Sequence, residues 1–239
     1  MLHSYIRMPT SLQTPPMKKY IIVALLAVAP LCTAQRVTLS KAEKTNTNTD
    51  KFLYKIDPAK NAAQYLGEVE VEGYTENDPE IFSQIYKKAK LIGANAFALR
   101  LSPGIDSDVN PFNPSHYRIS LYYSGDFPKE TNIAYLFSSG EKPQKIRVDG
   151  KRLILRPRSY IKKVINFGGE NSISAGNLLG SRINLSAKEG QPVQYFQISP
   201  FDVKADQSGQ GGINVKSGDI IGLERSYAEF LSVIYKAHR

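Results

Sequence analysis

Histidine and cysteine, the residues most often used for metal binding and nucleophilic catalysis, are scarce in this chain. The histidines are His3, His116 and His238, and the one cysteine is Cys32. A structural zinc site takes four protein ligands, and a catalytic triad needs a nucleophile and an orienting acid beside its histidine. His116 stands far from the other three residues in sequence, so we read it as a loop or strand-end residue. The sequence therefore predicts no catalytic residue, no metal site and no cofactor.

Acidic residues form two groups that resemble sites. Glu68, Glu70 and Glu72 alternate with valines, which places them on one face of a strand. Such a row can hold a cation or a basic peptide, but more often it is solvated and discourages edge pairing. The stretch 106–110, Asp-Ser-Asp-Val-Asn, resembles the start of a calcium loop, but Pro111 and the residue at position 117 stand where an EF-hand needs Gly and Glu. We expect an Asx-rich turn there, because Asp and Asn favour turns.

Basic residues are dense between 142 and 163, where Asp149 is the one acid. Such a cluster attracts anionic surfaces and polymers. The alternative is that the cations only keep strand edges solvated and unpaired. Whether they share one face is left open by the sequence. The candidate ligand-binding residues are Lys145, Arg147, Lys151, Arg152, Arg156 and Arg158.

The acidic row belongs to a predicted β-α-β-β module over residues 52–125. Residues 65–73 alternate charged and apolar side chains, which predicts a half-buried strand with Val69 and Val71 inward. Asn77-Asp78-Pro79 is a helix start, and Gly93 is a natural stop. Strands are expected at 94–101 and 116–123. The apolar stripe of the helix is Ile81, Phe82, Ile85, Ala89 and Ile92.

The stretch from Gly67 to Leu101 resembles the YbjQ-like small α/β modules. In it Gly67-Glu68-Val69 opens a strand, and Gly93-Ala94-Asn95-Ala96 leads from the helix into the next strand. The resemblance implies a small α/β sheet that can oligomerise, and it carries over no catalytic residue.

The basic cluster belongs to a predicted β-sandwich-like domain over residues 130–200. Asp149-Gly150 is a preferred tight-turn dipeptide between two alternating runs, which predicts a hairpin over 144–155. Further strands are expected at 133–137, 159–164, 181–185 and 191–198, and short strands with Gly and Pro turns are typical of a sandwich. The hairpin and the late Tyr-Phe-Gln-Ile strand are similar to PEGA-type exported domains. That resemblance implies a cell-surface or periplasmic accessory domain.

Two segments flank these regions. Residues 35–51 are read as a flexible linker, because 40–50 is almost without apolar side chains. Residues 201–239 are read as a long loop followed by an amphipathic helix. The aromatic and β-branched residues at 230–235 leave a final strand as the alternative to that helix.

The first 34 residues have the three-part pattern of a signal peptide. Met17 is the expected start, Lys18 and Lys19 form the positive region, and 21–29 is an apolar run too short to span a membrane. The pattern predicts export to the periplasm or beyond. Lipidation at Cys32 is the alternative, although Leu31 stands where a small residue is usual. Cleavage removes the single cysteine, so no disulfide is expected, and the formal net charge falls from +9 to +6.

Together these features predict an α+β fold, a β-α-β-β module followed by an antiparallel β-sandwich-like domain. The expected function is a non-enzymatic binding or scaffold protein of the bacterial envelope. Its expected partners are anionic envelope surfaces or proteins, and export argues against nucleic acid. The alternative is an envelope-polymer hydrolase that uses unassigned carboxylates.

Overall fold

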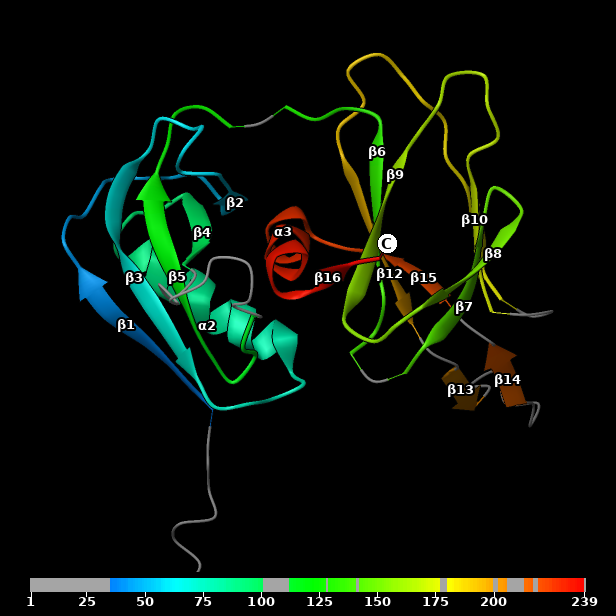
Figure 1. Ribbon diagram of the computed structural model, residues 1–239, viewed down its shortest axis with the longest axis horizontal. Coiled ribbons are helices and arrows are strands. Elements are labelled where there is room, and N and C mark those ends of the chain that lie inside the picture. Colours follow the sequence, from blue (N-terminus) through cyan, green and yellow to red (C-terminus); the bar gives the residue numbers. More distant parts are fainter. Residues whose placement is uncertain are drawn as a thin grey trace, which may run out of the picture. The chain divides into compact units, whose positions relative to one another are not determined.

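Strands dominate the fold (Figure 1). The computed structural model describes residues 35–100, 112–127, 129–140, 142–176, 180–199, 202–205, 213–216 and 219–238. Within these ranges the chain forms the helices α2 (Asp78–Leu91) and α3 (Arg225–Ile234) and several mixed or antiparallel sheets. The predicted α+β class is confirmed.

The first sheet contains the predicted β-α-β-β module and two further strands. Its strand order is β1-β3-β5-β4-β2. The prediction of a flexible linker over 35–51 is wrong for residues 36–42, which pair with β3 in antiparallel register because Val37 and Leu39 add apolar side chains to the core. The strands are β1 (Arg36–Ala42), β2 (Tyr54–Lys55), β3 (Gln64–Glu72), β4 (Ala96–Arg100) and β5 (His116–Tyr123).

Helix α2 begins and ends as its sequence predicts. The Asn77 side chain accepts a hydrogen bond from the backbone N–H of Glu80 at 3.3 Å, and Pro79 lies in the first turn. Gly93 follows the helix at φ +75°, and a Cβ there would lie 1.7 Å from the carbonyl oxygen of Asn46. Only glycine fits this position. The buried stripe contains Ile81, Ile85 and Ala89.

The acidic row on β3 is less solvated than its pattern suggests. Val69 and Val71 are fully buried, as expected, but Glu68 is only 3% exposed. Arg118 on the neighbouring strand β5 and Arg100 on β4, one strand further along the sheet, pair with its carboxylate, at 3.7 and 2.5 Å. The solvated reading of Glu68 is therefore wrong, because the two arginines cover it.

Two more sheets follow. One has the order β11-β10-β7-β8 and is antiparallel throughout. The other has the order β15-β12-β6-β9-β16 and is mixed, because β12 runs parallel to β6 and β16 parallel to β9. The prediction of a wholly antiparallel domain is wrong for this second sheet. The strands are β6 (Ile133–Phe137), β7 (Gln144–Val148), β8 (Lys151–Leu155), β9 (Ser159–Val164), β10 (Ser172–Ala175), β11 (Arg182–Asn184), β12 (Gln194–Ser199), β15 (Asp219–Gly222) and β16 (Lys236–Ala237).

The hairpin of β7 and β8 forms at the predicted turn. Asp149 has φ +48° and Gly150 has φ +75°. Positive φ at both central residues is what a type I′ turn requires, and its twist matches that of the flanking strands. The turn fixes the register that sets Arg147 opposite Arg152.

The C-terminal segment contains strands in addition to the predicted helix. Residues expected to be a loop contain the strands β13 (Asp202–Ala205) and β14 (Ile213–Lys216), which pair with each other, and the start of β15. The helix prediction is confirmed by α3, and the alternative of a strand at 230–235 is wrong. Glu224 caps α3 by accepting from the N–H groups of Ser226 and Tyr227.

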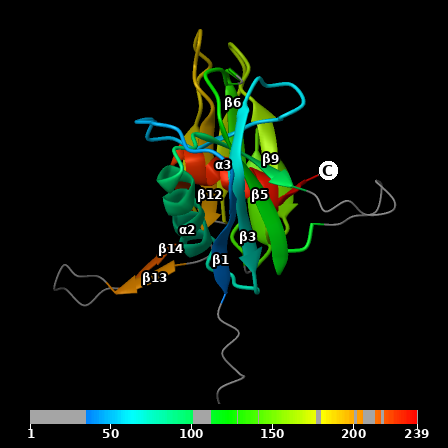
Figure 2. The same ribbon diagram turned by 90° about the vertical axis from the view of Figure 1, so that its left-hand side faces the viewer.

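Helix α3 lies between the first sheet and the mixed sheet (Figure 1), and the turned view shows it overlapped by β3 of the first sheet (Figure 2). Alternation along β6 explains this packing. Tyr135 and Phe137 join Phe230 of α3 in one core cluster, while Leu136 faces the antiparallel sheet and packs in a second cluster with Ile146. The first cluster also contains residues of β3, α2 and β5, so one core runs across the predicted boundary at 125–130.

The predictions for Met17 and Cys32 and for the Asx-rich stretch 106–110 lie outside the described residues. Among the helices that the structure describes, none is long and apolar enough to cross a membrane.

Candidate functional site

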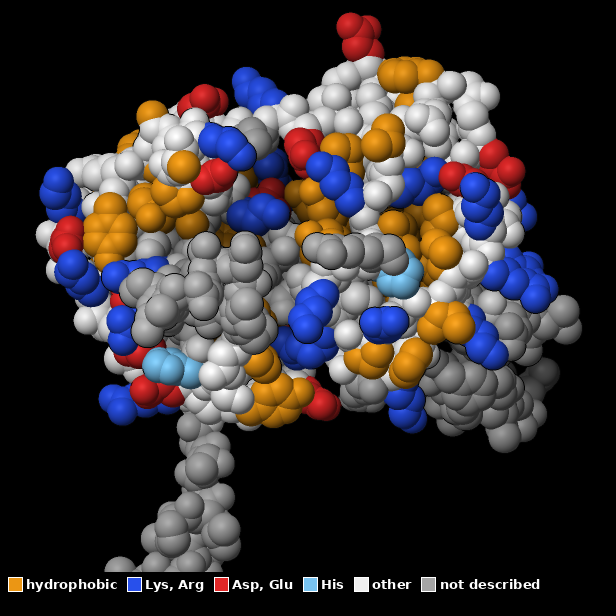
Figure 3. Space-filling view, viewed as in Figure 1, with side chains coloured by type: hydrophobic (Ala, Val, Ile, Leu, Met, Phe, Trp, Pro, Cys, Tyr) orange, Lys and Arg blue, Asp and Glu red, His pale blue; other side chains and the backbone are white. Residues whose placement is uncertain are grey.

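A pocket of about 560 Å³ lies between β2, the connection from β5 to β6, the mixed sheet and α3. Figure 3 shows charged and apolar side chains mixed around the hollow between the part of the molecule that contains β2 and the part that contains β6. Its wall contains four aromatic residues, four cations and four carboxylates. The aromatic residues are Tyr54, Phe127, Tyr135 and Tyr195; the cations are Lys55, Lys60, Lys162 and Arg225; the carboxylates are Asp57, Asp126, Glu130 and Glu229.

Aromatic rings pair on both sides of the pocket. The ring of Tyr54 lies 3.9 Å from that of Phe127, and the guanidinium of Arg225 lies 4.6 Å from the Tyr54 ring centroid. Across the pocket, the rings of Tyr135 and Tyr195 are stacked with centroids 5.6 Å apart. Paired rings hold one another in place, so these side chains form a preformed apolar wall.

Glu229 on α3 holds three elements of the wall together. Its side chain is 9% exposed, and its carboxylate accepts hydrogen bonds from Arg225 Nε at 2.7 Å and from the Tyr195 hydroxyl at 3.1 Å. It also accepts from the backbone N–H of Lys55 at 2.6 Å. Burial, together with this carboxylate, raises the pKa of Tyr195. Glu229 therefore anchors β2 and β12 to the helix.

A second ion pair closes the opposite side. Lys162 Nζ lies 2.5 Å from Glu130, whose carboxylate also accepts from the Tyr135 hydroxyl at 3.2 Å. At the exposed rim, Lys60 pairs with Asp57 at 3.0 Å. Three of the four carboxylates in the wall are thus bound to a cation, which does not leave them as free acids for hydrolysis.

Among the four cations of the wall, Lys55 is the one without an ion pair to any described residue. Its ammonium donates to Ser232 Oγ at 2.9 Å, and in the part of the chain that the structure describes it makes this one hydrogen bond and no direct ion pair. Burial lowers the pKa of Lys55, and the nearby carboxylates of Glu229 and Glu130 oppose that shift. An ammonium has three protons to donate, so it has capacity for a further acceptor.

Lys90 shows how a partly buried lysine is satisfied elsewhere in this fold. Burial lowers its pKa as well, yet its ammonium reaches the carbonyl oxygens of Asp50 and Phe52, both at 2.7 Å, and that of Ala94 at 3.5 Å. Lys90 is a structural clamp. The contrast marks Lys55 as a partly buried lysine that lines the pocket, has unused donors and has no carboxylate partner among the described residues.

The six predicted residues do not form one site. The register places Arg147 directly opposite Arg152, and Lys145 lies on the same outer face of the hairpin. Lys151 alternates onto the other face, and exposed Arg156 follows the end of β8. The predicted cluster is therefore divided between the two faces of the hairpin and the segment that follows it.

The prediction that Arg158 binds an anionic ligand is wrong, because this residue pairs with a carboxylate of the protein itself. It donates both guanidinium Nη groups to Asp78 of α2, at 2.9 and 3.0 Å, and Tyr235 donates its hydroxyl to the same carboxylate at 2.8 Å. Burial raises the pKa of Asp78, against the opposing effect of Arg158. The Asp78 side chain is only 3% exposed, so the guanidinium of Arg158 is held in a buried ion pair and is not free to bind a ligand. This pair joins the connection between β8 and β9 to α2.

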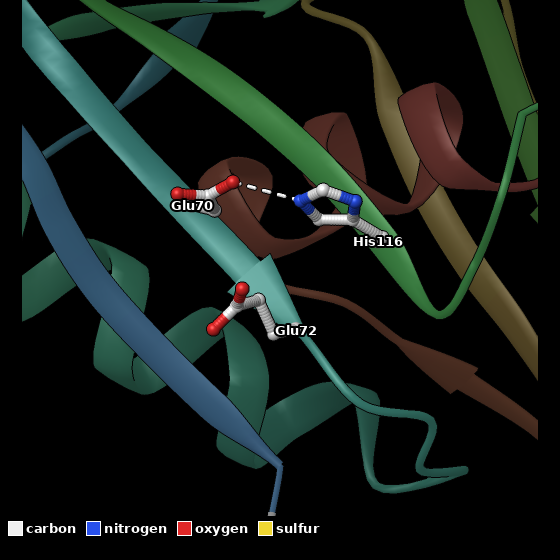
Figure 4. A group of neighbouring side chains, drawn as sticks. All are labelled: Glu70, Glu72 and His116. Carbon is white, nitrogen blue, oxygen red and sulfur yellow. Dashed lines mark hydrogen bonds and ion pairs between the residues drawn. The ribbon is translucent and has the colours of Figure 1, made fainter.

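His116 lies beside two acidic residues of β3, a group that was not predicted from the sequence. Glu72 lies opposite it in the β3–β5 register, and Glu70 points at its ring, with 2.7 Å between the carboxylate and Nε2 (Figure 4). One ligand atom from each residue lies within 4.8 Å of the others, which is compatible with a cation. The same Glu70 oxygen, however, accepts two hydrogen bonds from Arg118, at 2.9 and 3.0 Å. We read the group as an ion-pair network.

Comparison with family models, with curated proteins and with solved structures found no match. The resemblances to YbjQ-like and PEGA-type modules stay predictions. The pocket itself was missed at the level of sequence, because its residues come from positions 54 to 232. The one local signal was the aromatic and lysine pair Tyr54-Lys55 beside a polar stretch.

Proposed function

We propose that this protein is a non-enzymatic binding protein, exported to the bacterial envelope, that holds a carboxylate-bearing ligand in the pocket beside Lys55. The unused donors of the Lys55 ammonium carry this proposal. A partly buried cation is costly unless it is paired, and a carboxylate entering the pocket supplies the missing charge and acceptors.

The rest of the wall suits a ligand with an apolar or ring portion. The stacked rings of Tyr135 and Tyr195 and the tilted pair of Tyr54 and Phe127 offer flat apolar surface, and a few placed polar groups among such rings fix the orientation of a ligand. Sugar acids of envelope polymers and small aromatic acids share these two features. We propose either as the ligand class.

The surrounding architecture is consistent with a rigid holder. We propose that the mixed sheet and the antiparallel sheet act as a β-sandwich-like scaffold, since their facing sides share an apolar cluster around Leu136, Ile146 and Ile173. Glu229 and the Asp78–Arg158 pair then fix the first sheet and α3 against that scaffold.

The proposal is tested by thermal unfolding of the purified protein with matched acid and neutral compounds. Galacturonate is compared with galactose, and benzoate with benzyl alcohol, at constant ionic strength. We expect at least one acid to raise the unfolding temperature in a saturable way, since a ligand that binds only the folded state stabilises it. The proposal fails if neither acid acts differently from its neutral partner.

A Ser-Lys hydrolase is the second candidate, because Ser232 Oγ and Lys55 Nζ are 2.9 Å apart and a lowered lysine pKa suits a general base. The geometry favours binding over hydrolysis. Ser232 Oγ donates to the carbonyl of Glu229 at 2.7 Å, and it lies in the last turn of α3, where free carbonyl groups disfavour an oxyanion. A covalent adduct on Ser232 after treatment with a fluorophosphonate, found by mass spectrometry and absent from Ser232→Ala, would establish the hydrolase instead.

A further inference from the structure

The outer face of the β11-β10-β7-β8 sheet brings three arginines into one row. Arg152 lies opposite Arg147, Arg147 lies opposite Ser174, and Ser174 lies opposite Arg182, so the row crosses four neighbouring strands. Strands lie about 4.8 Å apart, which gives the row a length of roughly 14 Å. The inward residues of the same strands, Ile146 and Ile173 among them, fill the second core cluster.

The row has too little negative charge to balance it. Arg182 lies 3.7 Å from Glu170, and both side chains are 63% exposed, so this pair is weak. Within the described ranges, Arg147 and Arg152 have no ion-pair partner. Like charges directly opposite on antiparallel strands destabilise a sheet. The register fixed by the Asp149-Gly150 turn thus maintains an unfavourable contact that an anion would relieve.

The row also borders a hollow. A pocket of about 300 Å³ is lined by the three arginines, by Ser172 and Ser174, and by Glu170. Guanidinium groups bind phosphate oxygens through two parallel hydrogen bonds, and serine hydroxyls add neutral donors. Ser172 already donates to Glu170 at 2.8 Å, which leaves Ser174 as the hydroxyl at the centre of the row.

We infer that this face binds phosphate groups, with Arg147 and Arg152 as the primary ligands and Arg182 and Ser174 as flanking ones. The site lies on a different sheet from the pocket beside Lys55, and it goes beyond the proposed function. Of the six basic residues predicted from the sequence, the proposed site keeps only Arg147 and Arg152. It adds Arg182, which was not among them.

Calorimetric titration with inorganic pyrophosphate at constant ionic strength tests the inference. The site variant is Arg147→Gln with Arg152→Gln. The control variant is Lys151→Gln with Arg156→Gln, which removes the same charge from positions outside the row. Hydrogen bonds to charged groups contribute about 1.5 kcal/mol at the low end, so we expect at least roughly tenfold weaker binding by the site variant. The control should bind like the wild type.

The inference is overturned if the wild type does not bind pyrophosphate, or if the site and control variants bind it equally. Thermal unfolding without phosphate gives an independent check. The site variant should unfold at the same temperature as the wild type or higher, because the repulsion is gone, and a clearly lower temperature would contradict the argument.

Vesicles distinguish the source of the phosphate. Binding to phosphatidylglycerol vesicles, lost in the site variant and retained in the control, would identify lipid headgroups as ligands. Binding to pyrophosphate alone would identify soluble phosphates, and both results support the site.

Discussion

Breaking the ion pair between Asp78 and Arg158 should destabilise the whole fold. Arg158 is 18% exposed and Asp78 is 3% exposed, and the pair has two hydrogen bonds. Removing one partner of a buried pair costs about 3–5 kcal/mol, and the partial exposure of Arg158 places the Arg158→Met variant near 3 kcal/mol. At a urea dependence of about 2 kcal/mol per molar, the midpoint should fall by about 1.5 M.

The loss should depend on pH with a definite sign. Burial already raises the pKa of Asp78, and loss of the guanidinium removes the main opposing effect. A carboxyl whose pKa is raised by folding binds more protons in the folded state, so stability falls as the pH rises through the folded pKa. The destabilisation of Arg158→Met should therefore be larger at pH 7 than near pH 5.

Urea unfolding followed by circular dichroism gives these quantities. Arg156→Met is the matched control, since Arg156 is exposed, and it should change the unfolding free energy by less than about 0.5 kcal/mol. Adding Asp78→Asn to Arg158→Met should recover part of the loss, because no lone buried charge remains. A loss below about 1 kcal/mol for Arg158→Met at pH 7, or one that does not shrink toward pH 5, would show that the Asp78–Arg158 pair does not stabilise the fold in this way.

Three further substitutions test other contacts of the fold. Burial lowers the pKa of Lys55 below its usual 10.5, so the wild type should gain stability as the pH rises toward 10.5, and Lys55→Met should lack that gain in urea unfolding at pH 7 and pH 10.5. Gly93→Ala should cost more than about 1–2 kcal/mol in the same assay, from its left-handed backbone and the clash at its Cβ; a neutral result would contradict the geometry. Asp149→Ala removes the carboxylate 2.5 Å from Lys163, which is 7% exposed, and should cost about 3 kcal/mol; a loss like that of a surface substitution would show that Lys163 finds another partner.

Local patterns were enough to predict the elements that depend on neighbours in sequence. The helix from Asp78 has its cap, its stripe and its terminal glycine within 17 residues, and the Asp149-Gly150 hairpin needs only its own turn. Strand β1 was missed because the polar run after it dominates the composition, although Val37 and Leu39 give it an apolar face.

The sites depend on contacts that no local pattern contains. Arg158 looked like one more cation of the basic cluster, and only the fold brings it to Asp78, 80 residues earlier. Arg182 joins Arg147 through the register of β10, and Lys55 meets Ser232 because α3 returns to the first sheet. Sequence spacing predicts which faces are charged or apolar, while long-range pairing decides which charges are satisfied.

The most direct test of the pocket is calorimetric titration of galacturonate and of benzoate, the two acids of the thermal unfolding test, into the wild type, Lys55→Met and Lys60→Met. Both lysines border the pocket, but Lys60 is an exposed rim residue paired with Asp57. We expect saturable binding by the wild type and by Lys60→Met, and at least roughly tenfold weaker binding by Lys55→Met. Equal binding by Lys55→Met and the wild type would contradict the claim that the Lys55 ammonium is the ligand-binding group.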